Sequence, residues 1–196
     1  MKEKTELKFI SIFTATFLAI FIISALIMKN YEFLIYTIIA SILISIMVFY
    51  YQKFYLTPHI LLGLIILGLL HIAGLYLHLN GTRLYDIYLI NNIFRYDNLV
   101  HSFGIFVITF IGYNLLKPHL GKHIKYNKFL LSLILILIAM GIGTFNELLE
   151  LGAVIFFNAA EKIGDYLNNA LDLFFNLIGS IIACFFIIHY HKKTYK

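Results

Sequence analysis

The stretch from Gly164 to Gly179 reads G-D-Y-L-N-N-A-L-D-L-F-F-N-L-I-G and continues into a strongly apolar run that ends near Ile188. Its polar residues recur at spacings of three, four and seven, which places them on one face of a helix. A carboxylate inside a membrane-length helix is destabilising without a partner and often marks a functional residue. We therefore expect a functional site on this helix. The polar face consists of Asp165, Asn168 or Asn169, Asp172, Asn176 and Gly179.

The composition around this stretch is typical of a membrane protein. Of the 196 residues, 61% are hydrophobic and 13% are charged, whereas soluble domains have about 45–50% apolar and about 25% charged residues. At about 20 residues per span, six spans with short loops fit the length of the chain. The sequence thus predicts an all-α integral membrane protein, a bundle of six transmembrane helices in one domain over residues 1–196. The predicted spans are 9–27, 33–50, 59–79, 98–116, 129–147 and 168–188.

Two segments between these spans are less regular. The apolar character of the fifth span resumes after Glu150 and continues to Phe157, so one long helix and a span followed by a short re-entrant piece both remain open. The segment from Arg83 to Arg95 is polar and rich in tyrosine. Tyrosine is enriched where membrane meets water, so we expect this segment to lie at the interface.

The distribution of charge predicts how the bundle is oriented. With the N-terminus inside and six spans, the cytoplasmic segments hold eleven of the fifteen lysine and arginine residues. Positive residues concentrate on the cytoplasmic side, so we predict a multi-pass protein of the cell membrane with both termini cytoplasmic. Most of the acidic residues then lie at the outer side. These are Asp86, Asp97, Glu147, Glu150, Glu161, Asp165 and Asp172.

Other features limit the possible partners. A single cysteine, Cys184, leaves no intramolecular disulfide. The basic residues lie at span ends and do not interleave with aromatic residues, so we expect no nucleic-acid partner. We expect membrane lipid to surround the protein. The sequence does not predict an oligomeric state. The abundance of Ile, Lys, Asn, Tyr and Phe indicates an AT-rich prokaryotic genome.

Three predicted spans carry acidic residues at their outer ends. Asp97 and His101 are four residues apart at the start of the fourth span and share one helix face. The fifth span reaches the outer side with Glu147 and Glu150, and the sixth begins there with Asp172. Successive spans with short connections are usually neighbours, so we expect the three clusters to meet near the outer boundary.

Several carboxylates in one poorly solvated pocket need protons or cations to neutralise them. Oxygen ligands with one imidazole suit Mg²⁺, Mn²⁺ or Zn²⁺, so the expected cofactor is a divalent metal ion. His101 and Glu147 are the candidate catalytic acid and base. The candidate metal ligands are Asp97, His101, Glu147, Glu150, Asp165, Asp172 and Asn176.

The same residues also have purely structural interpretations. Asp97 and Asp165 could cap the N-termini of the fourth and sixth helices. Glu147 and Glu150 could be solvated at the end of a span, and Asn176 could form a hydrogen bond between helices. The sequence leaves both interpretations open.

Two histidines and two arginines lie close to the predicted site. His71 and His78 are seven residues apart on one face of the third span, either as packing residues or as hydrogen-bonded support for the metal ligands. Arg83 and Arg95 are candidate counter-ions for the acids, or anchors for an anionic head group.

Three short motifs carry a family resemblance. They read Y-D-x-x-x-H at 96–101, E-x-x-E at 147–150, and D followed by D-x-x-x-N-x-x-G at 165–179. Over residues 95–183 this pattern resembles the YjdF-type integral membrane proteins and, more remotely, the VanZ-like proteins associated with glycopeptide resistance. The resemblance implies a polytopic membrane protein with its site at these motifs. VanZ-like proteins often have lysine after the first aspartate, where this chain has Asn98, so the resemblance does not extend to the glycopeptide role.

The sequence favours one function and leaves two others open. The favoured function is a membrane-embedded, metal-dependent hydrolase or transferase that acts on a lipid or lipid-linked envelope substrate. The first alternative is a cation or proton transporter with the carboxylates as binding or relay groups. The second is a non-enzymatic, lipid-binding envelope resistance factor.

Overall fold

The computed structural model describes residues 56–157 and 166–194, together with scattered positions between residues 12 and 42. The chain divides into two compact units, Met1–Leu56 and Thr57–Lys196. The predicted spans 9–27 and 33–50 fall largely outside the described residues, although the positions described within them are helical. The candidate site lies in the second unit.

Long helices make up most of the described part of the second unit. They are α3 (Pro58–Tyr76), α4 (Tyr96–Leu116), α6 (Lys128–Phe157) and α8 (Tyr166–Thr194). Among the described residues, these four helices are long and apolar enough to cross a membrane. They correspond to the last four predicted spans. The short helix α5 (Lys122–Tyr126) lies between α4 and α6 in the chain.

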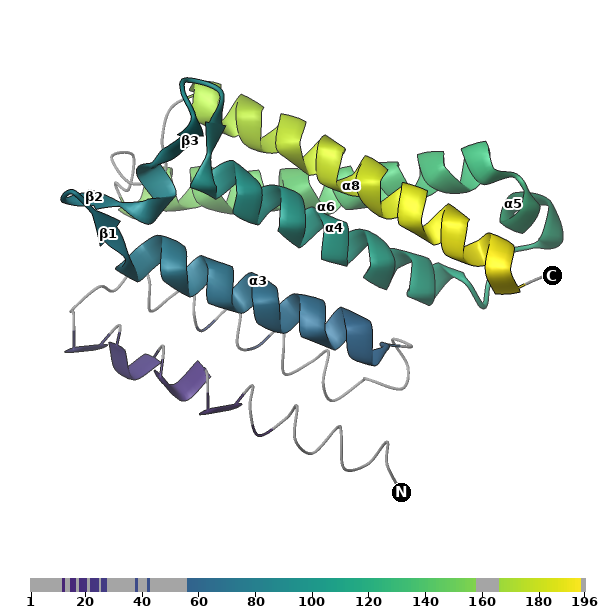
Figure 1. The fold of residues 1–196 in the computed structure, drawn as a ribbon, viewed down its shortest axis with the longest axis horizontal. Helices are drawn as coiled ribbons and strands as arrows, with labels where there is room; N and C mark the ends of the chain where they lie inside the picture. The colour runs from purple at the N-terminus through teal and green to yellow at the C-terminus, as the bar shows by residue number, and fades with distance from the viewer. Residues whose placement is uncertain are drawn as a thin grey trace. The chain divides into compact units, whose positions relative to one another are not determined.

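Helix α4 is in contact with the other three long helices. It packs against α3, α6 and α8, and α6 also packs against α8 (Figure 1). Two small β-hairpins, formed by residues 78–83 and 88–95, lie at one end of α3, α4 and α8 (Figure 1). Helix α5 lies at the opposite end (Figure 1). Helices α4 and α8 both begin at the hairpin end, whereas α6 ends there, so three polar helix ends meet at the same level.

The buried face of α8 is the polar stripe that the sequence predicted. Asn168, Asp172, Asn176 and Ser180 are at most 3% exposed and follow one another every four residues. Gly179 lies where α8 comes closest to α4, because an added Cβ would be 2.9 Å from the carbonyl carbon of Ser102 and closer still to its oxygen. The missing side chain thus permits the close contact that buries the stripe.

Helix α6 decides between the two interpretations of the fifth span. It is one continuous helix from Lys128 to Phe157, so the chain stays helical through Glu147 and Glu150. The re-entrant piece is therefore absent from the described residues 128–157. The helix continues for ten residues beyond the predicted span of 129–147.

The predicted third span, 59–79, is wrong at its end. Helix α3 stops at Tyr76, because Leu77 adopts an extended conformation. Residues 78 and 79 then form strand β1 (His78–Leu79), which pairs with β2 (Thr82–Arg83). Asn80 and Gly81 between them have φ angles of 53° and 82°, as a two-residue type I′ hairpin turn requires.

A second hairpin precedes α4. The fold is therefore mostly helical, and the prediction that it is all-α missed two short hairpins. The 3₁₀ helix η1 (Leu84–Asp86) leads to strand β3 (Tyr88–Ile90), which pairs with β4 (Phe94–Arg95). The side chain of Tyr85 is buried against α3 and the start of α4, where Gly74 of α3 leaves room for its ring. We refer to residues 77–95 as the hairpin cap.

Candidate functional site

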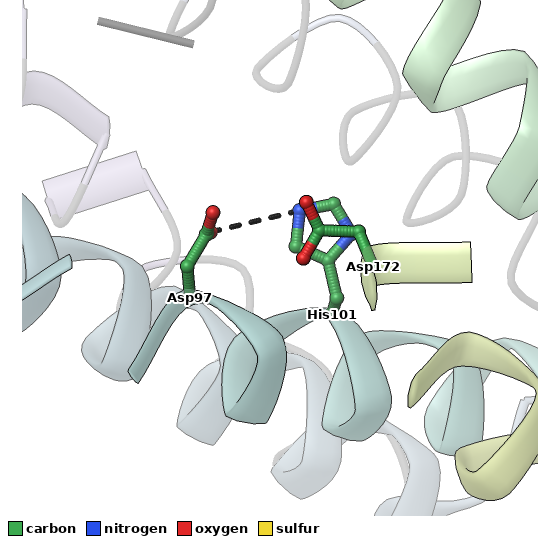
Figure 2. A group of neighbouring side chains, drawn as sticks. All are labelled: Asp97, His101 and Asp172. Atoms are coloured by element: carbon green, nitrogen blue, oxygen red, sulfur yellow. Dashed lines mark ion pairs between the residues drawn. The ribbon is translucent and has the colours of Figure 1, made fainter. Parts of the chain in front are cut away.

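The centre of the candidate site is His101, on the second turn of α4. Asp97 lies one turn earlier on the same face, and its Oδ1 is 3.6 Å from Nε2 of His101 (Figure 2). Asp97 is in the first turn and Arg95 is the N-cap, so Asp97 does not cap the helix. Figure 2 also shows Asp172, which reaches the same place from α8.

Helix α6 brings two more carboxylates to the imidazole. Oε1 of Glu147 lies 3.4 Å from Nδ1 of His101, and Oε1 of Glu150 lies 3.9 Å from Nε2. Both ring nitrogens of His101 therefore face carboxylates. Asn146 donates a hydrogen bond of 2.8 Å from Nδ2 to Oε1 of Glu150, which holds this side chain along α6.

These side chains form two groups that share His101. One group is Asp97, His101 and Asp172, and the other is His101, Glu147 and Glu150. In each group, one ligand atom from every residue lies within 4.8 Å of the others. Oxygen and imidazole nitrogen donors at this separation fit Mg²⁺, Mn²⁺ or Zn²⁺.

Glu147 provides a second observation that fits a cation. Its side chain is buried, with 7% of the residue exposed, yet neither carboxylate oxygen has a hydrogen-bond partner among the described residues. Buried polar atoms in native proteins are nearly always satisfied by protein, water or an ion. The residues present thus fit a cation in both donor chemistry and unmet bonding capacity.

Asp172 is held by two amides and is fully buried. Its Oδ1 accepts a hydrogen bond of 2.7 Å from Nδ2 of Asn98, and its Oδ2 accepts one of 2.8 Å from Nδ2 of Asn168. Each carboxylate oxygen retains a lone pair that these bonds do not use. Asp172 is therefore fixed in orientation and can still bind a further group.

Arg95 closes these contacts into a ring. Its Nη1 donates to Oδ1 of Asn168 at 2.7 Å, and its backbone N–H donates to Oδ1 of Asn98 at 2.7 Å. We call Arg95, Asn98, Asn168 and Asp172 the polar ring. Nη2 of Arg95 also donates to the hydroxyl of Tyr88, whose ring centroid is 4.7 Å from the guanidinium carbon. The hairpin cap, α4 and α8 are thereby joined at one carboxylate.

The structure brings together five of the seven predicted ligands. These are Asp97, His101, Glu147, Glu150 and Asp172. Asp165 lies outside the described residues. Asn176 is buried one turn further along α8, against Gly143 of α6, and belongs to neither ligand group.

The other predicted residues have separate partners. Nδ1 of His71 is hydrogen-bonded to the hydroxyl of Tyr85, and burial raises the pKa of this tyrosine well above its ordinary value. His78 contacts the backbone oxygen of Tyr76 from strand β1, so the prediction that His71 and His78 share a helix face is wrong. Their separation arises because α3 ends before residue 78.

The two arginines differ in their surroundings. Arg83 forms a bidentate ion pair with Asp86, with both N–O distances 2.9 Å, and this hydrogen bonding raises the pKa of the guanidinium. Arg95 instead lies two hydrogen bonds from Asp172, through Asn168. Of the two, Arg95 is the one connected to the candidate site.

Sequence reasoning missed the role of Asn98, which is fully buried and bonds to both Asp172 and the backbone of Arg95. A signal for it exists, because Asn98 is the third residue after the N-cap. At that position a polar side chain commonly bonds back to the N-cap N–H. Its second bond, to a residue 74 positions away, has no such local signal.

Comparison with known proteins supports the membrane assignment. No curated protein and no solved structure matches the chain. The expected membership of a YjdF-type membrane protein family is confirmed by a family match that covers nearly the whole chain. That match spans residues 9–193, and the chain therefore belongs to the family described as predicted membrane protein (DUF2238).

Proposed function

We propose that the protein is a metal-dependent hydrolase or transferase of the cell membrane that acts on a lipid or lipid-linked envelope substrate. The observation that carries the proposal is the convergence of four carboxylates from three helices on the two ring nitrogens of His101. Such a concentration of acid in a membrane-length bundle needs cations or protons to be stable. A divalent cation explains both the acids and the buried oxygens of Glu147, which accept no hydrogen bond from the described residues.

The residues divide into ligands and supporting groups. Asp97, His101 and Asp172 would hold one cation, and Glu147 and Glu150 with His101 would hold a cation on the α6 side. A bound cation of this kind supplies Lewis acidity and lowers the pKa of bound water.

The supporting groups keep the ligands in place and handle protons. The polar ring fixes the orientation of Asp172 and leaves a lone pair on each carboxylate oxygen available to a cation. Where Asp97, His101 and Asp172 alone hold the cation, Glu147, 3.4 Å from Nδ1 of His101, would act as the acid or base. Hydrogen-bonded support of this kind commonly tunes a metal site.

The surroundings of the site favour an amphiphilic substrate. On α6, Phe145 and Leu148 flank Glu147 in sequence and are 61% and 57% exposed, as expected for side chains that face lipid. The acidic groups lie close by, at the end of the bundle. A lipid with a polar head group could reach them from within the bilayer plane.

The described part of the bundle gives less support to transport. Further along the helices from the site, the buried hydroxyls of Thr109 and Ser180 donate to carbonyls of their own helices. Leu131, Leu135 and Ile187 fill the space near the opposite end. On α8 the buried polar side chains continue past Asp172 only as the uncharged Asn176 and Ser180, and the next buried residues of the described helix are Ala183, Cys184 and Ile187.

The test is turnover of lipid by purified protein in nanodiscs. With Mn²⁺ and a mixed phospholipid extract, wild type should release phosphate, head group or fatty acid, and Glu147→Gln should lose at least most of this activity. Asp86→Asn is the matched control, because Asp86 pairs with Arg83 and does not belong to either ligand group. If the protein binds lipid but turns none over in any condition, the enzyme hypothesis is wrong and the lipid-binding alternative takes its place.

A further inference from the structure

The hairpin cap exposes a set of large aliphatic side chains. Each is between 47% and 59% exposed, although a soluble loop of this length would normally carry polar residues there. Two of them precede the turn of the first hairpin, and the other three lie on β3 and in the turn of the second hairpin. The residues are Leu77, Leu79, Leu89, Ile90 and Ile93.

The connections of the cap place it at a membrane boundary. It begins after Tyr76, at the end of α3, and finishes before Tyr96, at the start of α4. Both helices are long and apolar enough to cross a membrane. A segment of 19 residues that leaves one such helix and enters the next starts and ends at the same face of the bilayer.

The cap is fastened to the bundle and is not a free loop. Within the cap the N–H of Leu84 donates to the carbonyl of Leu77 at 2.8 Å, and the N–H of Tyr96, the first residue of α4, donates to the carbonyl of Ile87 at 3.0 Å. Tyr85 is buried against Gly74 and bonds to His71. The exposed aliphatic residues are therefore presented in a fixed arrangement.

The arginine side chains of the cap are hydrogen-bonded within the protein. Arg83 and Asp86 form a bidentate pair, and Arg95 donates inward to Asn168 and to Tyr88. A charge that is paired and hydrogen-bonded is much less destabilising away from water than an isolated one. The backbone of the strands is likewise bonded within each hairpin. The outer surface of the cap thus carries the five aliphatic side chains among exposed polar ones, which include His78, Asn80, Thr82, Asn91 and Asn92.

We propose that the hairpin cap lies in the lipid leaflet, with Leu79 and Ile90 among the acyl chains below the head groups. The partner is the bilayer surface itself, because the cap joins the ends of two helices that are long and apolar enough to cross a membrane. Aliphatic side chains interleaved with polar ones suit the boundary between head groups and acyl chains. The cap thus forms a rigid, membrane-immersed platform beside the candidate site.

The absence of tryptophan from the chain makes the test direct. In Ile90→Trp and in Leu79→Trp, the introduced residue is the only tryptophan, so its fluorescence reports one position. Each variant is reconstituted as the full chain in phosphatidylcholine vesicles with brominated acyl chains. We expect blue-shifted emission, strong loss of intensity with brominated lipid, and protection from aqueous iodide.

Two reference variants set the scale. Leu137→Trp marks the lipid-facing middle of α6, where the native side chain is 63% exposed. His119→Trp marks the polar loop after α4, where an exposed histidine follows Lys117 and Pro118. The proposal is wrong if the tryptophans of Ile90→Trp and Leu79→Trp match that of His119→Trp in emission wavelength and in quenching by bromine and iodide. Shielding from both bromine and iodide would also overturn it, since protein and not lipid would then cover the cap.

Discussion

Replacing Asn98 by leucine removes two hydrogen bonds from the polar ring at once. The amide of Asn98 donates to Oδ1 of Asp172 and accepts from the backbone N–H of Arg95, each at 2.7 Å. Leucine has nearly the same volume and no polar atom. The substitution therefore leaves a buried carboxylate oxygen and the N-cap N–H without these partners, and tests whether the ring stabilises the fold.

The expected loss follows from the nature of the two bonds. A hydrogen bond to a charged group contributes about 1.5–3 kcal/mol. A bond between neutral groups in a membrane protein averages about 0.6 kcal/mol, because the unfolded chain in lipid also finds partners. The free energy of unfolding of Asn98→Leu should thus be lower than that of wild type by about 2–4 kcal/mol.

The assay is reversible unfolding in mixed micelles, followed by far-UV circular dichroism as denaturing detergent is added. Asn91→Leu is the matched control, because Asn91 is exposed in the turn of the second hairpin and lies outside the polar ring. It should change the free energy of unfolding by less than about 0.5 kcal/mol. A loss below about 1 kcal/mol for Asn98→Leu would show that the ring does not stabilise the protein as reasoned here.

Two further predictions concern packing and pH. Gly179→Ala should destabilise the protein by about 1–3 kcal/mol, because the new methyl group meets the backbone of α4. In the same unfolding assay Gly141→Ala should be neutral or stabilising, because a methyl group at this position meets nothing within 4 Å. Burial raises the pKa of Tyr85, so the folded protein holds this proton more tightly than the unfolded chain does. The stability that Tyr85 contributes relative to Tyr85→Phe should be fully present below about pH 10 and should be lost as the pH rises through the raised pKa. A stability difference that does not change with alkaline pH would contradict this.

Helical periodicity accounts for most of what the sequence predicted correctly. Asn168, Asp172 and Asn176 recur every four residues, and the structure buries all three on one face of α8. Asp97 and His101 share a face of α4 for the same reason. Local spacing determines which side chains lie together on one helix, and short connections determine which helices are neighbours.

The errors occur where structure depends on few residues or on distant ones. Apolar residues continue past Tyr76, so hydropathy alone extended α3 into the hairpin cap, although the Asn80-Gly81 pair is a strong hairpin signal. Strands of two or three residues are too short to show an alternating pattern. The bond between His71 and Tyr85 joins residues 14 positions apart and depends on how the cap folds back on α3.

The central claim is that His101 lies at the centre of a divalent cation site. The most direct measurement is elemental analysis of protein purified into nanodiscs, equilibrated with Mn²⁺ and freed of unbound metal. Wild type and Asp86→Asn should retain stoichiometric metal, and His101→Ala should lose it because both ligand groups contain His101. A folded wild-type protein that retains no Mn²⁺, Mg²⁺ or Zn²⁺ above the level of His101→Ala would contradict the claim.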